Sequence, residues 1–147
     1  MEEKRYRFNR KFGKIYLEDG KELIEVGESL KVIILWSSEA IFAKPFAHLA
    51  AQEWVQLTFI DNKSNWCYAL LNGGLTNALF PWFEYRKQIS NKGLDMTEVI
   101  TTISLIKAGD VFDYSFSGVP GKPGLKERMN NLIQTSNYLL MDSSIDL

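Results

Sequence analysis

The chain has 147 residues, the length of one domain, and 46% of them are hydrophobic, which is enough for a buried core. The net charge of −1 argues against a uniformly basic nucleic-acid-coating protein, although the first 14 residues carry +4 and the other 133 carry −5. A single cysteine and a single histidine exclude an internal disulfide and a zinc site built from those residue types.

Residues 1–13 combine basic side chains with three aromatic ones. This composition fits a segment that lies along a phosphate backbone while its rings stack on bases. A solvated arm whose rings are tucked into the core fits it equally well. We expect a basic N-terminal arm whose candidates for phosphate contact are Arg5, Arg7, Arg10 and Lys11.

The next segments predict strands with one undecided region. Residues 14–17 fit a short strand that ends at a turn, and residues 22–28 are acidic and favour no structure. Residues 29–36 are rich in β-branched side chains between polar flanks, which is typical of a well-buried strand. Residues 37–53 are undecided: residues 40–51 are apolar and rich in alanine with Pro45 in the middle, which fits a strand, a covering loop or a short helix after the proline.

A hairpin is predicted for residues 54–60 and 65–71, around a polar turn. In the first strand Trp54, Gln56 and Thr58 share one face, and residues 55, 57 and 59 share the other, so one face is expected in the core and the other is available. The second strand has apolar side chains on both faces, and alternation alone does not identify its core side. Cys67 has no base nearby and is expected to be a buried small side chain.

The glycine pair Gly73–Gly74 ends this hairpin and lacks the spacing of a phosphate-binding loop. It is followed by apolar residues at helical spacing, which predict a helix over residues 75–91. Residues 99–106 and 111–116 predict a second hairpin. A linker rich in proline and glycine then leads to a helix predicted for residues 125–140.

The order strand, hairpin, helix, hairpin is that of an OB-fold, a five-stranded, partly open barrel with a helix between strands three and four. We therefore expect a mainly β protein with helices, in which residues 14–118 form the OB-like domain. Residues 119–140 are expected to form a C-terminal helical extension, and residues 141–147 a flexible acidic tail.

Residues 66–116 resemble phage- and plasmid-borne single-stranded-DNA-binding proteins of the OB type. In those proteins a strand ends in a turn of small residues, a helix with aromatic and basic residues follows, and a strand rich in valine and threonine precedes a final aromatic strand. The residues that match are Gly73, Gly74, Leu75, Trp82, Tyr85, Arg86, Lys87, Gly93, Val99, Ile100, Thr101, Thr102, Phe112, Asp113 and Tyr114. The resemblance implies binding of single-stranded DNA.

Single-stranded nucleic acid is therefore the expected partner, held by aromatic stacking and by the basic residues of the arm. The candidates for stacking are Trp36, Trp54, Trp66 and Tyr68. The alternative is an OB-like interaction module that binds another protein through the C-terminal helix or the acidic tail, or that forms a homo-oligomer.

No catalytic residues, metal or cofactor are expected, because the carboxylate pairs fall at turn signals without a companion base. No apolar run approaches the roughly 18 residues of a membrane span, and the charged N-terminus lacks the apolar centre of a signal peptide. We expect a cytoplasmic protein without a membrane partner.

Overall fold

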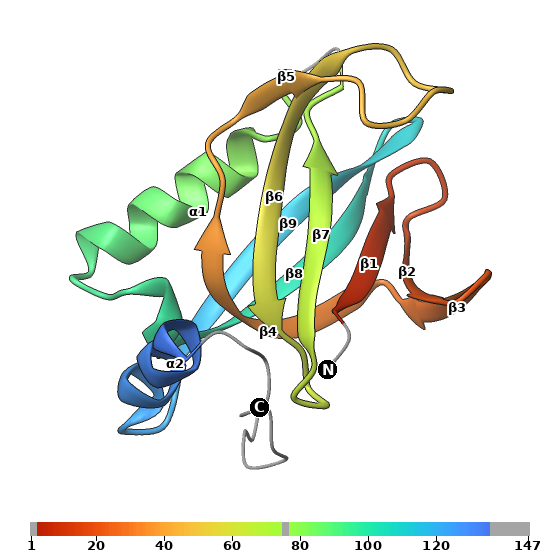
Figure 1. The fold of residues 1–147 in the computed structure, drawn as a ribbon. Coiled ribbons are helices and arrows are strands. Elements are labelled where there is room, and N and C mark those ends of the chain that lie inside the picture. Colours follow the sequence, from red (N-terminus) through yellow and green to blue (C-terminus); the bar gives the residue numbers. More distant parts are fainter. Residues whose placement is uncertain (1–2, 75–76, 136–147) are drawn as a thin grey trace.

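The computed structural model describes residues 3–74 and 77–135, and this part of the chain forms nine strands and two α-helices (Figure 1). A short 3-10 helix, η1, spans Met96–Glu98. The helices are α1 (Phe80–Asn91) and α2 (Leu125–Gln134). The strands are β1 (Lys4–Asn9), β2 (Lys14–Asp19), β3 (Glu22–Gly27), β4 (Ser29–Ser37), β5 (Ile41–Ala43), β6 (Gln52–Ile60), β7 (Trp66–Asn72), β8 (Val99–Ala108) and β9 (Val111–Pro120).

All nine strands form one sheet in the order β3-β2-β1-β7-β6-β4-β8-β9, with β5 paired beside β6. β4 joins the two halves of this sheet, because residues 29–32 pair with β8 whereas residues 33–37 pair with β6. The register of β4 shifts between Ile34 and Trp36, which marks a bulge, and bulges bend strands. The sheet curls into a half-barrel in which β8 and β9 lie across from β6 and β7 (Figure 1).

The mainly β fold with two helices confirms the predicted fold class, but the prediction of five strands is wrong. β1 arises within the predicted basic arm, because Tyr6 and Phe8 alternate with basic residues and pack into the core. β3 lies in the segment that favoured no structure, and β5 has only three residues. The first helix, predicted after the third strand, therefore lies between the seventh and eighth strands, β7 and β8.

The main core lies inside the half-barrel. The apolar odd-numbered positions of β6 and β7 point inward, and all six of these side chains are 0% exposed: Val55, Leu57, Phe59, Cys67, Ala69 and Leu71. α1 covers this core with Trp82, Tyr85 and Ile89, and it packs against β9 (Figure 1). The core face of the first hairpin strand is therefore the one that carries Val55, Leu57 and Phe59.

A second, smaller core lies on the outer face of the sheet, under α2. Ile33, Ile60 and Trp66 point outward from three neighbouring strands, and α2 covers them with Leu125 and Met129. The structure places this helix at Leu125–Gln134, and residues 136–147 lie outside the described part of the chain, including the predicted acidic tail. The apolar side of α2 is thus used to cover the sheet.

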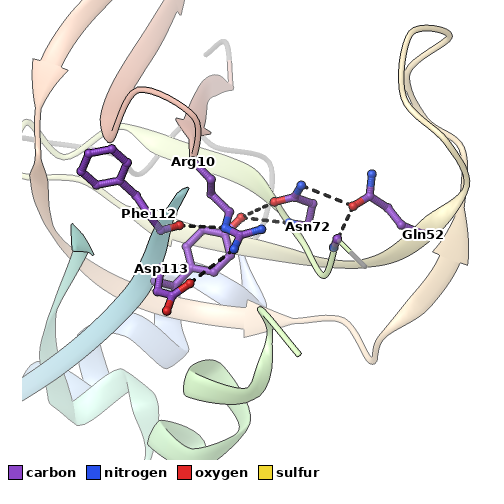
Figure 2. Close-up of polar contacts among 7 residues, drawn as sticks. Arg10, Gln52, Asn72, Phe112 and Asp113 are labelled. Atoms are coloured by element: carbon purple, nitrogen blue, oxygen red, sulfur yellow. Dashed lines mark hydrogen bonds and ion pairs between the residues drawn. The ribbon is translucent and has the colours of Figure 1, made fainter. Parts of the chain in front are cut away.

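Side chains close the gap between β7 and β9, which are not neighbours in the described sheet. The Tyr114 hydroxyl donates to Asn72 Oδ1 at 2.7 Å and accepts from the Asn72 backbone N–H at 3.0 Å. Asn72 Nδ2 also donates to Gln52 Oε1 at 3.3 Å (Figure 2). The Arg10 Nε–H donates to the Phe112 carbonyl at 2.9 Å, and the Phe112 N–H donates to the Arg10 carbonyl at 2.8 Å. The β1–β2 turn and the end of β7 therefore hold β9 in place.

Candidate functional site

In the part of the chain that the structure describes, the outer face of the half-barrel is covered at its two ends and more exposed between them. α2 covers one end through the second core. The segment of residues 44–51 covers the other end, where the Phe46 ring lies 5.5 Å from the Trp54 ring. The Trp54 Nε1–H also donates to the carbonyl of Ala43, the last residue of β5, at 3.2 Å, which fixes the start of this segment beside β6. Between these ends, Trp36 is exposed and Thr58 and Tyr68 are half-buried.

A row of four paired residues crosses the outer face between these ends. Trp36 of β4 pairs with Thr58 of β6, Thr58 pairs with Tyr68 of β7, and Tyr68 pairs with Arg5 of β1. Directly paired residues of neighbouring strands point to the same side of a sheet, so all four share the outer face. Trp36 is 54% exposed and the other three are half-buried. We call these four residues the outer strip.

Arginines and rings contact each other at the β1 end of the outer strip. The guanidinium carbon of Arg5 lies 5.3 Å from the Phe46 ring centroid and 5.6 Å from the Tyr68 ring centroid. The guanidinium of Arg7 lies 5.6 Å from the same Phe46 ring and forms an ion pair with Glu18. These cation–π contacts hold two positive charges against aromatic faces.

A cavity of about 630 Å³ adjoins this end of the outer strip. Its walls are β1, the β1–β2 turn, the segment of residues 44–51, the ends of β6 and β7, and single residues of β2 and β3. All four predicted phosphate-contact residues line it, namely Arg5, Arg7, Arg10 and Lys11. Six Phe, Tyr and Trp side chains line it as well: Tyr6, Phe8, Phe12, Tyr16, Phe46 and Trp54. We call it the basic cavity. The fold thus brings the four basic candidates to one concave surface.

Arg10 differs from the other three basic residues because it is committed to contacts within the protein. Its side chain is only 12% exposed and is 3.4 Å from the Asp113 carboxylate. Its guanidinium carbon lies 5.5 Å from the Tyr114 ring centroid, and its Nε donates to the Phe112 carbonyl (Figure 2). Arg10 therefore fastens the β1–β2 turn to β9, and Arg5, Arg7 and Lys11 supply the more accessible positive charge.

The four predicted stacking residues separate into two pairs. Trp36 and Tyr68 lie together on the outer strip. Trp54 is 7% exposed under Phe46, and Trp66 is 8% exposed in the second core. These two rings pack inside the protein and do not offer an open face to a base.

Phe46 is a site residue that the sequence reasoning missed. It lies in a segment without strand or helix periodicity, so alternation gave it no face. The available signal was an aromatic residue directly after Pro45, in a segment for which a covering loop was one of the options. Its role depends on Arg5 and Arg7, which are distant in sequence.

Burial keeps several ionisable groups of the core protonated. It raises the pKa values of the Tyr6 and Tyr114 hydroxyls and of the Cys67 thiol. The Tyr6 hydroxyl also donates to the Asp61 carboxylate at 2.7 Å, which raises its pKa further. Within residues 3–74 and 77–135, no three or more His, Cys, Asp or Glu side chains gather in a way that could hold a metal ion.

A second exposed surface is apolar. Phe42 of β5 is 71% exposed, and Phe80 and Phe83 of α1 are 56% and 38% exposed. These three rings line a cavity of about 420 Å³ beside the glycine turn. We call them the phenylalanine patch. Neither described helix is long and apolar enough to cross a membrane.

Comparison of the chain with protein-family models, curated proteins and solved structures finds no significant match. The resemblance to single-stranded-DNA-binding proteins of phages and plasmids therefore stays a prediction. The function has to be argued from the surfaces described above.

Proposed function

We propose that the protein binds single-stranded DNA, without catalysis, along the outer strip and into the basic cavity. The observation that carries this proposal is the row Trp36–Thr58–Tyr68–Arg5, which places two rings and a cation on the outer face of the sheet, with Trp36 54% exposed. Rings on a strand surface stack on bases of any sequence, and nearby cations contact the phosphates.

The connectivity supports this proposal. If the three-residue strand β5 is left aside, β4, β6, β7, α1, β8 and β9 have the chain order of an OB-fold, and β4 pairs with both β6 and β8. OB-folds bind oligonucleotides on the face of their second and third strands. In this chain those positions are β6 and β7, which carry the middle of the outer strip.

The contact energies are sufficient for useful affinity. A stacked base contributes about 1–3 kcal/mol, so the rings of Trp36 and Tyr68 would supply about 2–6 kcal/mol. Arg5, Arg7 and Lys11 would each neutralise a phosphate, and three such contacts to a single strand give a slope of log affinity against log salt of about −2. Binding is therefore expected to weaken with salt but to persist at moderate salt.

The direct test is quenching of tryptophan fluorescence by oligo-dT at low and at moderate salt. Trp36 is 54% exposed, whereas Trp54, Trp66 and Trp82 are 7%, 8% and 0% exposed, so contact quenching reports on Trp36. Saturable quenching that decreases with salt supports the proposal. Absence of quenching and of any gel shift at low salt would exclude it.

A second candidate function is an interaction module, and the phenylalanine patch favours it. The C-terminal helix is less suited to this role than predicted, because Leu125 and Met129 are buried in the second core. Light scattering after size-exclusion chromatography distinguishes the two readings. If the wild type is oligomeric and Phe42→Ser makes it monomeric, the patch mediates self-association; a monomeric wild type argues against that role.

We also propose a reducing, cytoplasmic location. The lone thiol of Cys67 is buried and free, as in proteins that do not rely on disulfides. Fractionation of cells that express the tagged chain tests this location.

A further inference from the structure

The outer strip differs at its two ends. At one end, β8 pairs with residues 29–32 of β4 and not with the residues around Trp36, so Trp36 lies at a border of the sheet. At the other end, the strip reaches Arg5 beside the basic cavity. A single DNA strand that contacts Trp36 and then Tyr68 would therefore reach the cavity next.

Acidic side chains stand beyond Arg5. The next residue in the row is Glu18 of β2, which pairs with Arg5 and forms the ion pair with Arg7. Residues 14–27, which form β2, β3 and their turn, carry four carboxylates and two lysines. A phosphate backbone that continued over β2 and β3 would meet net negative charge, which costs free energy.

Two neighbouring segments also line the cavity. Phe46 and Leu49 of the segment of residues 44–51 stand on one side of the cavity, and Lys11 and Phe12 of the β1–β2 turn stand on another. The strip itself crosses three strand spacings, about 14 Å at about 4.8 Å each. At about 3.4 Å per stacked nucleotide this distance holds about four nucleotides, a short site for one OB-fold.

We infer that the basic cavity receives the end of a single strand and binds its terminal phosphate. This inference rests on the proposed function. A terminal phosphate monoester carries about −1.5 to −2 charges at pH 7, more than an internal diester. Arg5, Arg7 and Lys11 surround the cavity with positive charge, and guanidinium groups match phosphate oxygens in a bidentate manner.

The test compares oligo-dT of one length in four forms, by competition against a labelled oligo-dT strand. The forms are a 5′-phosphorylated strand, a 3′-phosphorylated strand, a strand with hydroxyls at both ends and a covalently closed circle. We expect one phosphorylated strand to bind at least about tenfold more tightly than the hydroxyl strand and the circle, and that strand identifies the end that is bound.

The outcomes distinguish a failure of the inferred end recognition from a failure of the proposed function. If all four forms bind equally, the proposed function stands and the inference of end recognition is overturned. If none of them binds at low salt, the proposed function itself fails, and the inference fails with it.

Variants locate the terminal phosphate. In Arg7→Gln and Lys11→Gln, the affinity ratio of phosphorylated to hydroxyl strand should fall toward one, whereas Trp36→Ala should weaken binding of every form. Lys87→Gln, on the exposed side of α1, is the matched control and should keep the wild-type ratio. A wild-type ratio in both cavity variants, with unchanged melting temperatures, would place the phosphate elsewhere and overturn the inference.

Discussion

The Tyr114→Phe substitution tests whether side chains close the half-barrel between β7 and β9. Tyr114 is 2% exposed, and its hydroxyl makes two hydrogen bonds to Asn72, at 2.7 Å and 3.0 Å. The substitution keeps the ring and removes both bonds. The Asn72 backbone N–H and Oδ1 then lose these partners in a partly buried place.

The expected loss follows from these contacts. A typical hydrogen bond contributes about 0.5–1.5 kcal/mol net, and a buried group left without a partner costs about 1–3 kcal/mol. We expect Tyr114→Phe to lower the free energy of unfolding by about 2–3 kcal/mol. That is a large share of the roughly 5–15 kcal/mol of an ordinary domain.

The assay is urea unfolding followed by circular dichroism, with Tyr16→Phe as the matched control. Tyr16 is half-buried on β2, and its substitution should change stability by less than about 0.5 kcal/mol. In a double-mutant cycle, Tyr114→Phe and Asn72→Ala should show a coupling energy of about 1–2 kcal/mol. A loss no larger than that of the control, or no coupling, would refute this account of closure.

Three further predictions concern stability and charge. Gly13→Ala should lower the free energy of unfolding by more than about 1 kcal/mol in urea unfolding. Gly13 has φ +69°, and a Cβ there would lie 2.5 Å from a ring carbon of Phe112 in β9. An unchanged unfolding midpoint would contradict this prediction. Burial raises the pKa values of Tyr6 and Tyr114 above that of an unfolded tyrosine, so the free energy of unfolding should stay constant below about pH 10. Above that pH it should fall by up to about 1.4 kcal/mol per pH unit for each of the two groups. In alkaline unfolding titrations, Tyr6→Phe should make this fall smaller. Glu18→Gln should tighten oligo-dT binding several-fold by freeing Arg7, whereas weaker binding would show that the ion pair positions that arginine.

The regular strands could be predicted because their side chains alternate. In β6 the apolar odd-numbered positions are all fully buried, as the pattern indicates. β1 was not predicted because basic residues alternate with Tyr6 and Phe8 over only six residues, and this short pattern is also typical of a charged arm. β3 was not predicted because all its residues except Gly27 are exposed, so that burial imposes no pattern on the sequence.

The site could be predicted only in part, because tertiary contacts decide which rings are open. Trp66 and Tyr68 lie on the same face of one strand, yet α2 covers Trp66 and leaves Tyr68 half-buried beside Arg5. The basic candidates were found from composition alone. Their gathering around Phe46 depends on a segment that follows β5 and folds back over β6, and no local pattern encodes that contact.

The central claim is that the outer strip binds single-stranded DNA, and fluorescence anisotropy of a labelled oligo-dT strand tests it most directly. The account predicts saturable binding by the wild type, with a log–log salt slope of about −2. It predicts binding at least about tenfold weaker for Trp36→Ala and for Arg5→Gln, and unchanged binding for Lys87→Gln. Wild-type affinity in both strip variants, or no binding by the wild type at low salt, would contradict it.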